Sequence, residues 1–402
     1  YYMRTIIVLF FTLQSLSNYS QDINKIDSLI NNGIKLKAYP GAQVFFKKGD
    51  FKFHKSYGYH TYDSITKVDD DHLFDLASIT KTLASTLALM KLYDEKKLKL
   101  DNTISSFEKK LRRSNKKNTN FHELLIHQSG WIPYINHQQF LIKRNGEVKK
   151  RLISNFQKNN SIQIANDLYI KSNYYKTIVK RIKKTKVDNN ANYKYSGLFF
   201  CLVPEIVKMI SNKSFEVFLN ESFYSKLNLN LSFNPLNGNS KEKIVPTELD
   251  TVFRKQLIHG FVHDETAAIM GGISGNAGLF GNAKDIGKIS EMFLNYGVYN
   301  NERFLSSNTV KYFTNPGNYK NARETRGLGF DKPRLNSQDT LYPSEKLSID
   351  SYGHTGFTGT FFWIDPTNDF IIVLLTNRVY PSRSYENLYD LDIRRKLIDL
   401  II

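Results

Sequence analysis

Residues 74–81 have the sequence Phe-Asp-Leu-Ala-Ser-Ile-Thr-Lys, and the interpretation of the whole chain starts from this stretch. Ser78 is followed three positions later by Lys81. Because residues three apart in a helix lie on the same face, we expect the hydroxyl and the amine within hydrogen-bond distance of each other. Such a pair is typical of an activated serine nucleophile.

The surroundings of Ser78 favour that chemistry. A lysine accepts the serine proton only if burial or nearby cations lower its pKa. The chain beyond Ser78 is apolar at helical spacing, through Leu83, Leu87, Met90 and Leu92. This spacing predicts a helix with one buried face, and Ser78 at its N-terminus, where free N–H groups face a developing oxyanion.

The Ser-x-x-Lys spacing is not specific by itself, because it also occurs at Ser64, Ser106, Ser114 and Ser240. The stretch from Ser64 to Lys67 even has the same four residues, but three aspartates follow it instead of an apolar helix. We therefore expect these four copies on the solvated surface. For Ser78 itself the alternative is an ordinary helix N-cap.

Length and composition limit the classes of protein. A chain of 402 residues with 41% hydrophobic content can bury a large core, which excludes a disordered or fibrous protein. The single cysteine, Cys201, lies in an apolar stretch, so we expect a buried thiol, no internal disulfide and no multi-cysteine zinc site. The glycine-rich stretch 271–278 matches neither the Walker nor the dinucleotide pattern, and no His-Glu-x-x-His occurs. No cofactor or metal is predicted.

The N-terminus predicts export. Met3 and Arg4 precede a short apolar run at 5–13, and small and polar residues follow. This pattern is typical of a cleaved secretory signal over residues 1–20, since a membrane span needs about 20 apolar residues. The alternative is an uncleaved N-terminal anchor. An export signal without disulfides suits the periplasm or cell surface of a bacterium.

The formal charge of +18 is concentrated in one segment. Residues 141–190 contain thirteen Lys or Arg and three acidic residues. This segment could contact an anionic surface such as cell-wall polymers or lipid head groups, although a solvated insertion in a Lys- and Asn-rich chain is the favoured interpretation. No helix-turn-helix, zinc finger or RNA-binding signature accompanies the charge, so no nucleic-acid partner is predicted.

Strand patterns occur near both ends of the chain. A helix is predicted at 23–34 and another at 385–402, and the predicted strands are Ala42–Phe46, Phe51–Tyr59, Gly359–Ile364 and Phe370–Leu375. The predicted fold is therefore α+β. An antiparallel sheet built from N- and C-terminal segments is flanked by helices, and a largely helical region at about 78–315 is inserted between them. We expect residues 21–402 to form a single domain.

Two further segments could complete a site with Ser78. Tyr195 precedes an apolar helix and could act as a base, with a packed aromatic as the alternative. The stretch 352–360 contains three glycines at the edge of a strand. There the Phe357 N–H could be a second oxyanion donor beside that of Ser78, with a β-bulge or turn as the alternative.

Together these segments resemble the serine β-lactamase and penicillin-binding-protein superfamily, in the class C branch that includes D-alanyl-D-alanine carboxypeptidases and esterases. Residues 75–81 resemble its nucleophile motif, Leu124–Gly130 its Leu-Leu-x-His-x-Ser-Gly loop, and His354–Gly356 its third motif. Residues 262–264, 271–280, 353–360 and 363–366 are similar to a bacterial subgroup of serine hydrolases. The resemblance extends over about residues 23–400 and keeps the order of the motifs.

The resemblance implies a role for each motif residue. Ser78 would be the acylated nucleophile, Lys81 its proton partner and Tyr195 the base of the second motif. The N–H groups of Ser78 and Phe357 would form the oxyanion hole. The third motif, His354, Thr355 and Gly356, would contact the leaving-group or carboxylate side of the substrate.

Two positions depart from the family pattern. Gly197 stands where the second motif usually has asparagine, so the amide that would help to hold Lys81 is missing. His354 stands where most β-lactamases have lysine. An unperturbed histidine is mostly neutral at pH 7, so its attraction for a β-lactam carboxylate should be weaker. We predict esterase turnover above cephalosporin turnover.

The sequence thus predicts an exported serine hydrolase that acts through an acyl-enzyme on ester or peptide-like carbonyls. The expected partners are small-molecule esters, D-alanyl peptides or β-lactam-like substrates. The alternative is a non-catalytic cell-wall-binding protein that keeps the fold, which Gly197 and the basic segment 141–190 would suit.

Overall fold

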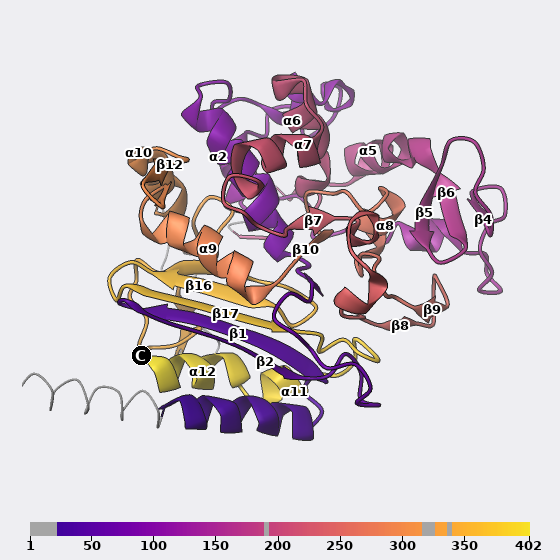
Figure 1. The fold of residues 1–402 in the computed structure, drawn as a ribbon. Helices are drawn as coiled ribbons and strands as arrows, with labels where there is room; N and C mark the ends of the chain where they lie inside the picture. The colour runs from indigo at the N-terminus through magenta and orange to yellow at the C-terminus, as the bar shows by residue number, and fades with distance from the viewer. Residues whose placement is uncertain (1–21, 189–192, 316–325, 336–339) are drawn as a thin grey trace, which may run out of the picture.

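A computed structural model describes residues 22–188, 193–315, 326–335 and 340–402 (Figure 1). The predicted signal segment 1–20 lies outside the described residues. Within these ranges, no helix combines the length and the apolar character that crossing a membrane requires.

A five-stranded antiparallel sheet joins the two ends of the chain. Its order is β15-β16-β17-β1-β2, and Phe45 of β1 pairs with Val373 of β17 on one side and His54 of β2 on the other. The strands are β1 Gly41–Lys48, β2 Phe51–Gly58, β15 Tyr352–Thr355, β16 Phe361–Asp365 and β17 Phe370–Thr376. The predicted α+β fold with a shared terminal sheet is confirmed.

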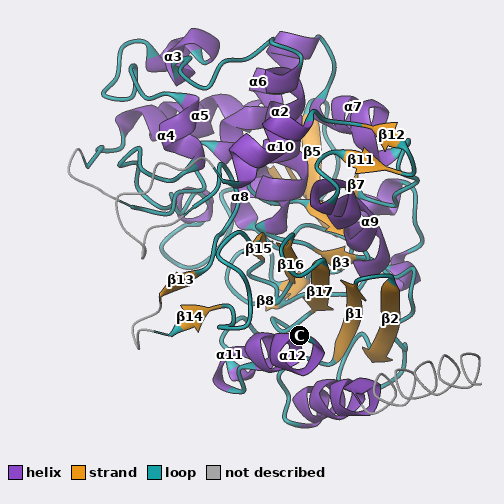
Figure 2. Ribbon diagram, turned by 90° about the vertical axis from the view of Figure 1, so that its left-hand side faces the viewer, coloured by secondary structure: helices purple, strands orange, loops and turns teal. Residues whose placement is uncertain are grey.

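Helices cover both faces of this sheet, which is why every residue of β16 and β17 is buried (Figures 1 and 2). The helix at 22–35 and helices α11 (Asn387–Asp390) and α12 (Ile393–Ile401) lie on one face. Helix α9 (Ala283–Leu294) packs against the other face. A side chain at Gly287 of α9 would meet the ring of Phe45 at 2.5 Å, so glycine is needed for this close packing.

The region between the terminal strands is mainly helical and lies above the sheet in Figure 1. Its helices are α2 Leu87–Asp94, which continues a π-helical turn at Lys81–Thr86, α3 Ile104–Phe107, α4 Phe121–Leu125, α5 Tyr175–Lys184, α6 Val203–Ser211, α7 Phe215–Leu219, α8 Glu265–Ile269 and α10 Ser307–Thr314. The predicted helix behind Ser78 is confirmed, because all of Lys81–Thr86 and most of α2 are buried.

The remaining strands are short. They are β3 Phe74–Asp75, β4 Ile153–Ser154, β5 Ser161–Ala165, β6 Leu168–Lys171, β7 Ser232–Phe233, β8 Leu249–Asp250, β9 Gln256–Leu257, β10 Leu279–Gly281, β11 Val298–Tyr299, β12 Glu302–Arg303, β13 Arg334–Leu335 and β14 Leu341–Tyr342. Strands β3, β10 and β7 form one small sheet, in the order β3-β10-β7.

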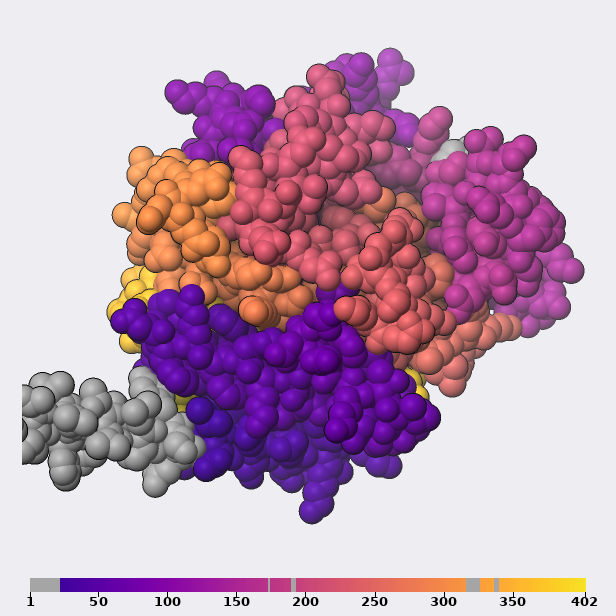
Figure 3. Space-filling model, in the orientation of Figure 1, coloured from indigo at the N-terminus to yellow at the C-terminus, as the bar shows by residue number. Residues whose placement is uncertain are grey.

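Two expectations about secondary structure were wrong. The basic segment contains a three-stranded sheet, β4-β6-β5, that stands at the side of the molecule (Figures 1 and 3). In β5 the alternation of Ile162 and Ile164 with exposed Gln163 covers too few residues to be distinguished from loop. The single C-terminal helix is two helices, since Asp392 has a φ of 50° and interrupts the helical hydrogen bonding.

Candidate active site

A small sheet fixes the chain on the N-terminal side of Ser78. Strand β3 pairs with β10, and the Leu76 N–H donates to the Leu279 carbonyl at 3.0 Å. In return the Leu279 N–H donates to the Thr80 hydroxyl at 3.1 Å. Ser78 therefore lies in a turn that hydrogen bonds to Leu279 hold on both sides, directly before the helix that carries Lys81.

The turn itself is held by a buried carboxylate. Asp75 accepts the Ala77 N–H at 2.8 Å and the His263 N–H at 2.6 Å. Ala77 has a φ of 45°, an uncommon conformation for a residue with a Cβ. Burial raises the pKa of the Asp75 carboxyl. The carboxylate thus holds the backbone in the conformation that presents Ser78.

Lys81 and Ser78 are in direct contact. The Nζ of Lys81 donates to the Ser78 Oγ at 2.8 Å and to the Asn276 carbonyl oxygen at 2.9 Å. Lys81 is 3% exposed, and its Nζ lies 5.4 Å from the ring centroid of Tyr195 and 5.9 Å from that of Phe200. The contact that the Ser-x-x-Lys spacing predicts is confirmed.

The loop that follows β15 is tied to the serine segment. The Thr358 hydroxyl donates to the Asp75 carbonyl at 2.7 Å, and the Thr360 hydroxyl donates to the Leu76 carbonyl at 3.1 Å. These bonds bring the backbone of Phe357 beside Ser78. Within the described part of the chain, the N–H groups of Ser78 and Phe357 donate to no protein acceptor. Both are therefore available to a ligand oxygen, as an oxyanion hole requires.

Tyr195 packs at a tilt against the ring of a neutral histidine. Its ring centroid lies 4.5 Å from that of His127, at an interplanar angle of 35°. The His127 Nδ1 accepts the Ser196 N–H at 3.1 Å. Burial, reinforced by the charges of Arg326 and Lys81, lowers the pKa of His127 well below its usual value. The histidine of the Leu124–Gly130 motif therefore supports the second motif as an uncharged ring.

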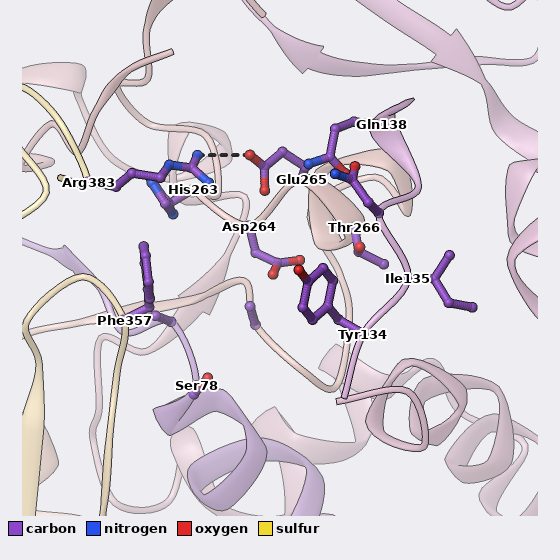
Figure 4. Close-up of a pocket in the computed structure, with 13 residues that line it drawn as sticks. Ser78, Tyr134, Ile135, Gln138, His263, Asp264, Glu265, Thr266, Phe357 and Arg383 are labelled. Atoms are coloured by element: carbon purple, nitrogen blue, oxygen red, sulfur yellow. Dashed lines mark hydrogen bonds and ion pairs between the residues drawn. The ribbon is translucent and has the colours of Figure 1, made fainter. Parts of the chain in front are cut away.

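Two cavities meet at Ser78. One, of about 410 Å³, is lined by Ser78, Tyr193, Tyr195, Arg326, Asp331, Arg334, His354, Thr355, Gly356, Phe357 and Tyr389. The other, of about 400 Å³, is lined by Ala77, Ser78, Tyr134, Ile135, Asn136, Gln138, His263, Asp264, Glu265, Thr266, Ala277, Phe357 and Arg383 (Figure 4). Ser78 and Phe357 belong to both. The structure thus brings together all seven residues that the sequence predicted for the site.

The first cavity contains a buried cation with unused donors. Arg326 is 5% exposed and pairs with Asp331 through Nη1, which also donates to the Tyr193 hydroxyl at 3.3 Å. Its Nε and Nη2 are buried without a partner among the described residues. Both atoms are enclosed by protein, so Arg326 acts on the cavity through its positive charge, which favours a carboxylate there.

His354 contributes no positive charge to that cavity. Burial lowers the pKa of His354 to about 4, although Asp331 acts in the opposite direction. Its Nδ1 lies 2.7 Å from the Thr355 carbonyl oxygen, so Nδ1 carries the proton and donates to it. The expectation of an uncharged histidine is confirmed. Arg326, which the sequence did not single out, supplies the cation instead.

The departure at Gly197 leaves a space next to Lys81. A Cβ at Gly197 would lie 3.8 Å from the Lys81 Cε and 3.9 Å from the Asn276 Cβ. The Asn276 Oδ1 accepts the Cys201 thiol at 3.4 Å, and burial raises the pKa of this thiol to about 12. The expectation of a buried Cys201 is confirmed. The backbone carbonyl of Asn276 is the protein group that holds Lys81 beside Ser78.

Sequence reasoning did not find Asn276, His127, Arg326, Asp331, Tyr134 or Asp264 as site residues. Asp264, Asn276 and His127 lie in stretches that resemble the family, at 262–264, 271–280 and 124–130, but the resemblance implied no role for them. Tyr134, Arg326 and Asp331 lie in stretches without a motif match. Among the described residues, no group of three or more His, Cys, Asp or Glu could hold a metal ion.

The terminal sheet, the inserted helical region and the Ser-Lys pair define a serine hydrolase. The model of the Beta-lactamase family matches residues 26–395, and the chain belongs to this family. An Escherichia coli O157:H7 protein named "Putative D-alanyl-D-alanine carboxypeptidase" is 32% identical over 386 residues, which are 89% of this chain and 82% of that protein. A protein of the same name from Salmonella typhimurium is 29% identical over 394 residues, with 89% and 83% covered.

Solved structures share the fold at lower identity. A class C beta-lactamase superposes with a TM-score of 0.67 and 18% identity, over 94% of this chain and 98% of that one. EstCE1, a hydrolase with promiscuous acyltransferase activity, gives a TM-score of 0.67 and 15% identity, over 96% and 99%. At these identities the similarity shows the fold alone.

Proposed function

We propose that this β-lactamase-family hydrolase cleaves ester or peptide-like carbonyl compounds through an acyl-enzyme formed on Ser78. The observation that carries the proposal is the 2.8 Å hydrogen bond between Lys81 Nζ and Ser78 Oγ, at the point where two cavities meet. A buried amine beside a half-exposed hydroxyl is an arrangement that activates a nucleophile.

The steps follow from the geometry. The Ser78 Oγ attacks the scissile carbonyl while Lys81, in its uncharged amine form, takes up the proton, which Lys81 and Tyr195 then exchange. The carbonyl oxygen becomes an oxyanion that accepts hydrogen bonds from the N–H groups of Ser78 and Phe357. The bond to the leaving group then breaks, and the leaving group takes the proton. Water attacks the resulting serine ester in the same way and releases the acid.

The leaving group occupies the cavity that contains Arg326 and Thr355. The positive charge of Arg326 in the wall of this cavity favours a leaving group with a carboxylate, such as a terminal D-alanine. The names of the relatives from Escherichia coli and Salmonella support the same substrate class. With a neutral His354 and no amide at position 197, β-lactams are the weaker substrates.

A comparison of three substrates tests this proposal. We expect turnover of a D-Ala-D-Ala peptide and of a 4-nitrophenyl ester, each faster than that of a chromogenic cephalosporin. Faster cephalosporin turnover would contradict the argument from His354. If wild type and Ser78→Ala hydrolyse none of the three, the alternative of a non-catalytic cell-wall-binding protein replaces the enzyme.

Export and contact with an anionic cell-wall polymer are part of the proposal. The proposal of export is based on the signal-like sequence of residues 1–20, and cell fractionation of the full-length chain tests it.

The proposed contact with the cell wall is based on the basic segment 141–190. A cavity of about 530 Å³ in this segment is lined by Lys180, Arg181 and Lys184, and it shares Tyr134 with the cavity of Figure 4. Salt-dependent sedimentation with isolated cell walls tests it, and the absence of co-sedimentation at low salt would contradict it.

A further inference from the structure

The cavity shown in Figure 4 differs in charge from the one that contains Arg326. Its charged lining consists of Asp264, Glu265 and Arg383. Ser78 and Phe357, which also border the first cavity, form its edge. Since the leaving group occupies the first cavity, this second cavity receives the acyl part of the substrate.

Asp264 presents an unpaired carboxylate oxygen to this cavity. Its Oδ1 caps helix α8 by accepting the Ala267 N–H at 2.8 Å and also accepts the Asn276 Nδ2 at 3.2 Å. Among the described residues, no group donates to Oδ2 and no cation forms an ion pair with Asp264. Figure 4 shows the carboxylate directed into the cavity, toward the ring of Tyr134.

The one cation of the lining is already neutralised. The Arg383 guanidinium contacts Glu265 at 2.8 Å and Glu248 at 2.6 Å. Glu248 also lies 2.9 Å from the Nε2 of His263, so the carboxylate that no cation pairs among the described lining residues is that of Asp264. In a chain with a formal charge of +18, the acyl-side cavity is therefore locally acidic.

We propose that the acyl group of the preferred substrate carries a protonated amine, which donates a hydrogen bond to the Oδ2 of Asp264. The inference rests on the proposed function, because it assigns the acyl side of the same reaction. With Arg326 on the leaving-group side, the preferred substrate has an ammonium in its acyl part and a carboxylate in its leaving group. A cavity of about 400 Å³ accommodates a short aminoacyl or peptidyl chain.

Matched esters test the charge preference. Three series of 4-nitrophenyl esters have acyl chains of equal length that end in an ammonium, a methyl or a carboxylate group, with three to six carbons between the ends. We expect the best ammonium ester to exceed its methyl counterpart by about tenfold in kcat/KM, the effect of one charge-assisted hydrogen bond. The carboxylate ester is expected to be the poorest.

The variant Asp264→Asn assigns the preference to one side chain. Asparagine keeps the acceptor that caps helix α8, and it removes the charge. We expect the ratio of kcat/KM between ammonium and methyl esters to fall to within about twofold of unity. As a matched control, Glu302→Gln on the exposed hairpin β11–β12 should leave the ratio at the wild-type value.

The outcomes separate the two proposals. If wild type hydrolyses all three esters faster than Ser78→Ala does, but without preference, the inference is wrong and the proposed function stands. If Asp264→Asn keeps the preference, the amine binds elsewhere and the inference is also wrong. If wild type hydrolyses none of the esters, the proposed function fails and the inference fails with it.

Discussion

The Nζ of Lys81 lies 2.8 Å from the Oγ of Ser78, and on its other side it donates a hydrogen bond to the backbone carbonyl oxygen of Asn276 at 2.9 Å. Lys81 is therefore fixed in position before any substrate arrives. Proton transfer from the hydroxyl needs no rearrangement of the side chain, which is the condition for efficient base catalysis.

Replacing Lys81 with methionine is expected to lower kcat by about 10²–10⁴, the usual contribution of a general base. Methionine keeps the buried packing volume, so the fold should persist. The chain offers a matched control in Lys67→Met, which alters the second, exposed Ser-Ile-Thr-Lys sequence. Steady-state ester hydrolysis measures both variants, and an unchanged kcat in Lys81→Met would refute the assigned role.

Two glycines in the site should respond differently to a methyl group. A Cβ at Gly356 would lie 1.9 Å from the Thr360 Oγ1 and 2.6 Å from the Leu76 carbonyl oxygen. We expect Gly356→Ala to lower the free energy of unfolding by about 1–3 kcal/mol and to displace the Phe357 N–H. The Cβ added in Gly197→Ala would have no atom closer than 3.8 Å, so this variant should change the free energy of unfolding by less than about 1 kcal/mol.

Chemical denaturation followed by circular dichroism measures both glycine variants. If Gly356→Ala and Gly197→Ala lowered the free energy of unfolding equally, the Gly356 loop would not be closely packed against the serine segment. Activity adds a second readout, because a misplaced oxyanion donor should reduce kcat by about 10²-fold or more.

Arg326 should determine the preference for a carboxylate in the leaving group. Wild type is expected to cleave a D-Ala-D-Ala peptide about 10–100-fold more efficiently than the same peptide with an amidated C-terminus, since charged hydrogen bonds contribute about 1.5–3 kcal/mol. Because Arg326 pairs with the partly buried Asp331, the test variant is Arg326→Met with Asp331→Asn, which removes both charges of the pair. Persistence of the preference in this double variant would contradict the assignment.

His354 predicts a specific dependence of stability on pH. Its pKa is about 4 in the folded protein and about 6.5 in the unfolded chain, so between these values the unfolded state binds one more proton. The free energy of unfolding is therefore not reduced by His354 above pH 6.5, and it decreases as the pH falls from 6.5 toward 4. In that window, His354→Gln should flatten the dependence of the free energy of unfolding by up to about 1.4 kcal/mol per pH unit.

Urea denaturation at pH 4.5, 5.5 and 6.5 measures the slope for wild type and His354→Gln. Parallel curves would mean that His354 takes up no proton on unfolding. Phosphate and acetate buffers of equal ionic strength exclude a salt effect as the cause of any difference.

The sequence predicts the terminal sheet because its strands carry their signals locally. The run at 370–375 is continuously apolar, the run at 42–46 is apolar except for Gln43, and the turn around Asp365–Asp369 marks a hairpin. The contact between Ser78 and Lys81 is also local, since helical geometry alone places them together. These parts could be predicted without knowledge of the tertiary structure.

The remaining site residues depend on contacts across long stretches of chain. The carbonyl of Asn276 reaches Lys81 from 195 positions away, and no pattern in a sequence identifies a backbone oxygen as a ligand. In the sequence, nothing around Arg326 distinguishes it from the other basic residues of this lysine-rich chain. Its buried position beside Asp331 in the wall of the cavity is a property of the packing, so only the structure distinguishes it.

The most direct test of the central claim is the mass of the protein after reaction with a fluorophosphonate probe. We predict one covalent adduct per chain, located on the tryptic peptide that contains Ser78, absent in Ser78→Ala and retained in the matched control Ser64→Ala. Absence of an adduct on wild type with both this probe and penicillin, or an adduct that persists in Ser78→Ala, would contradict the account.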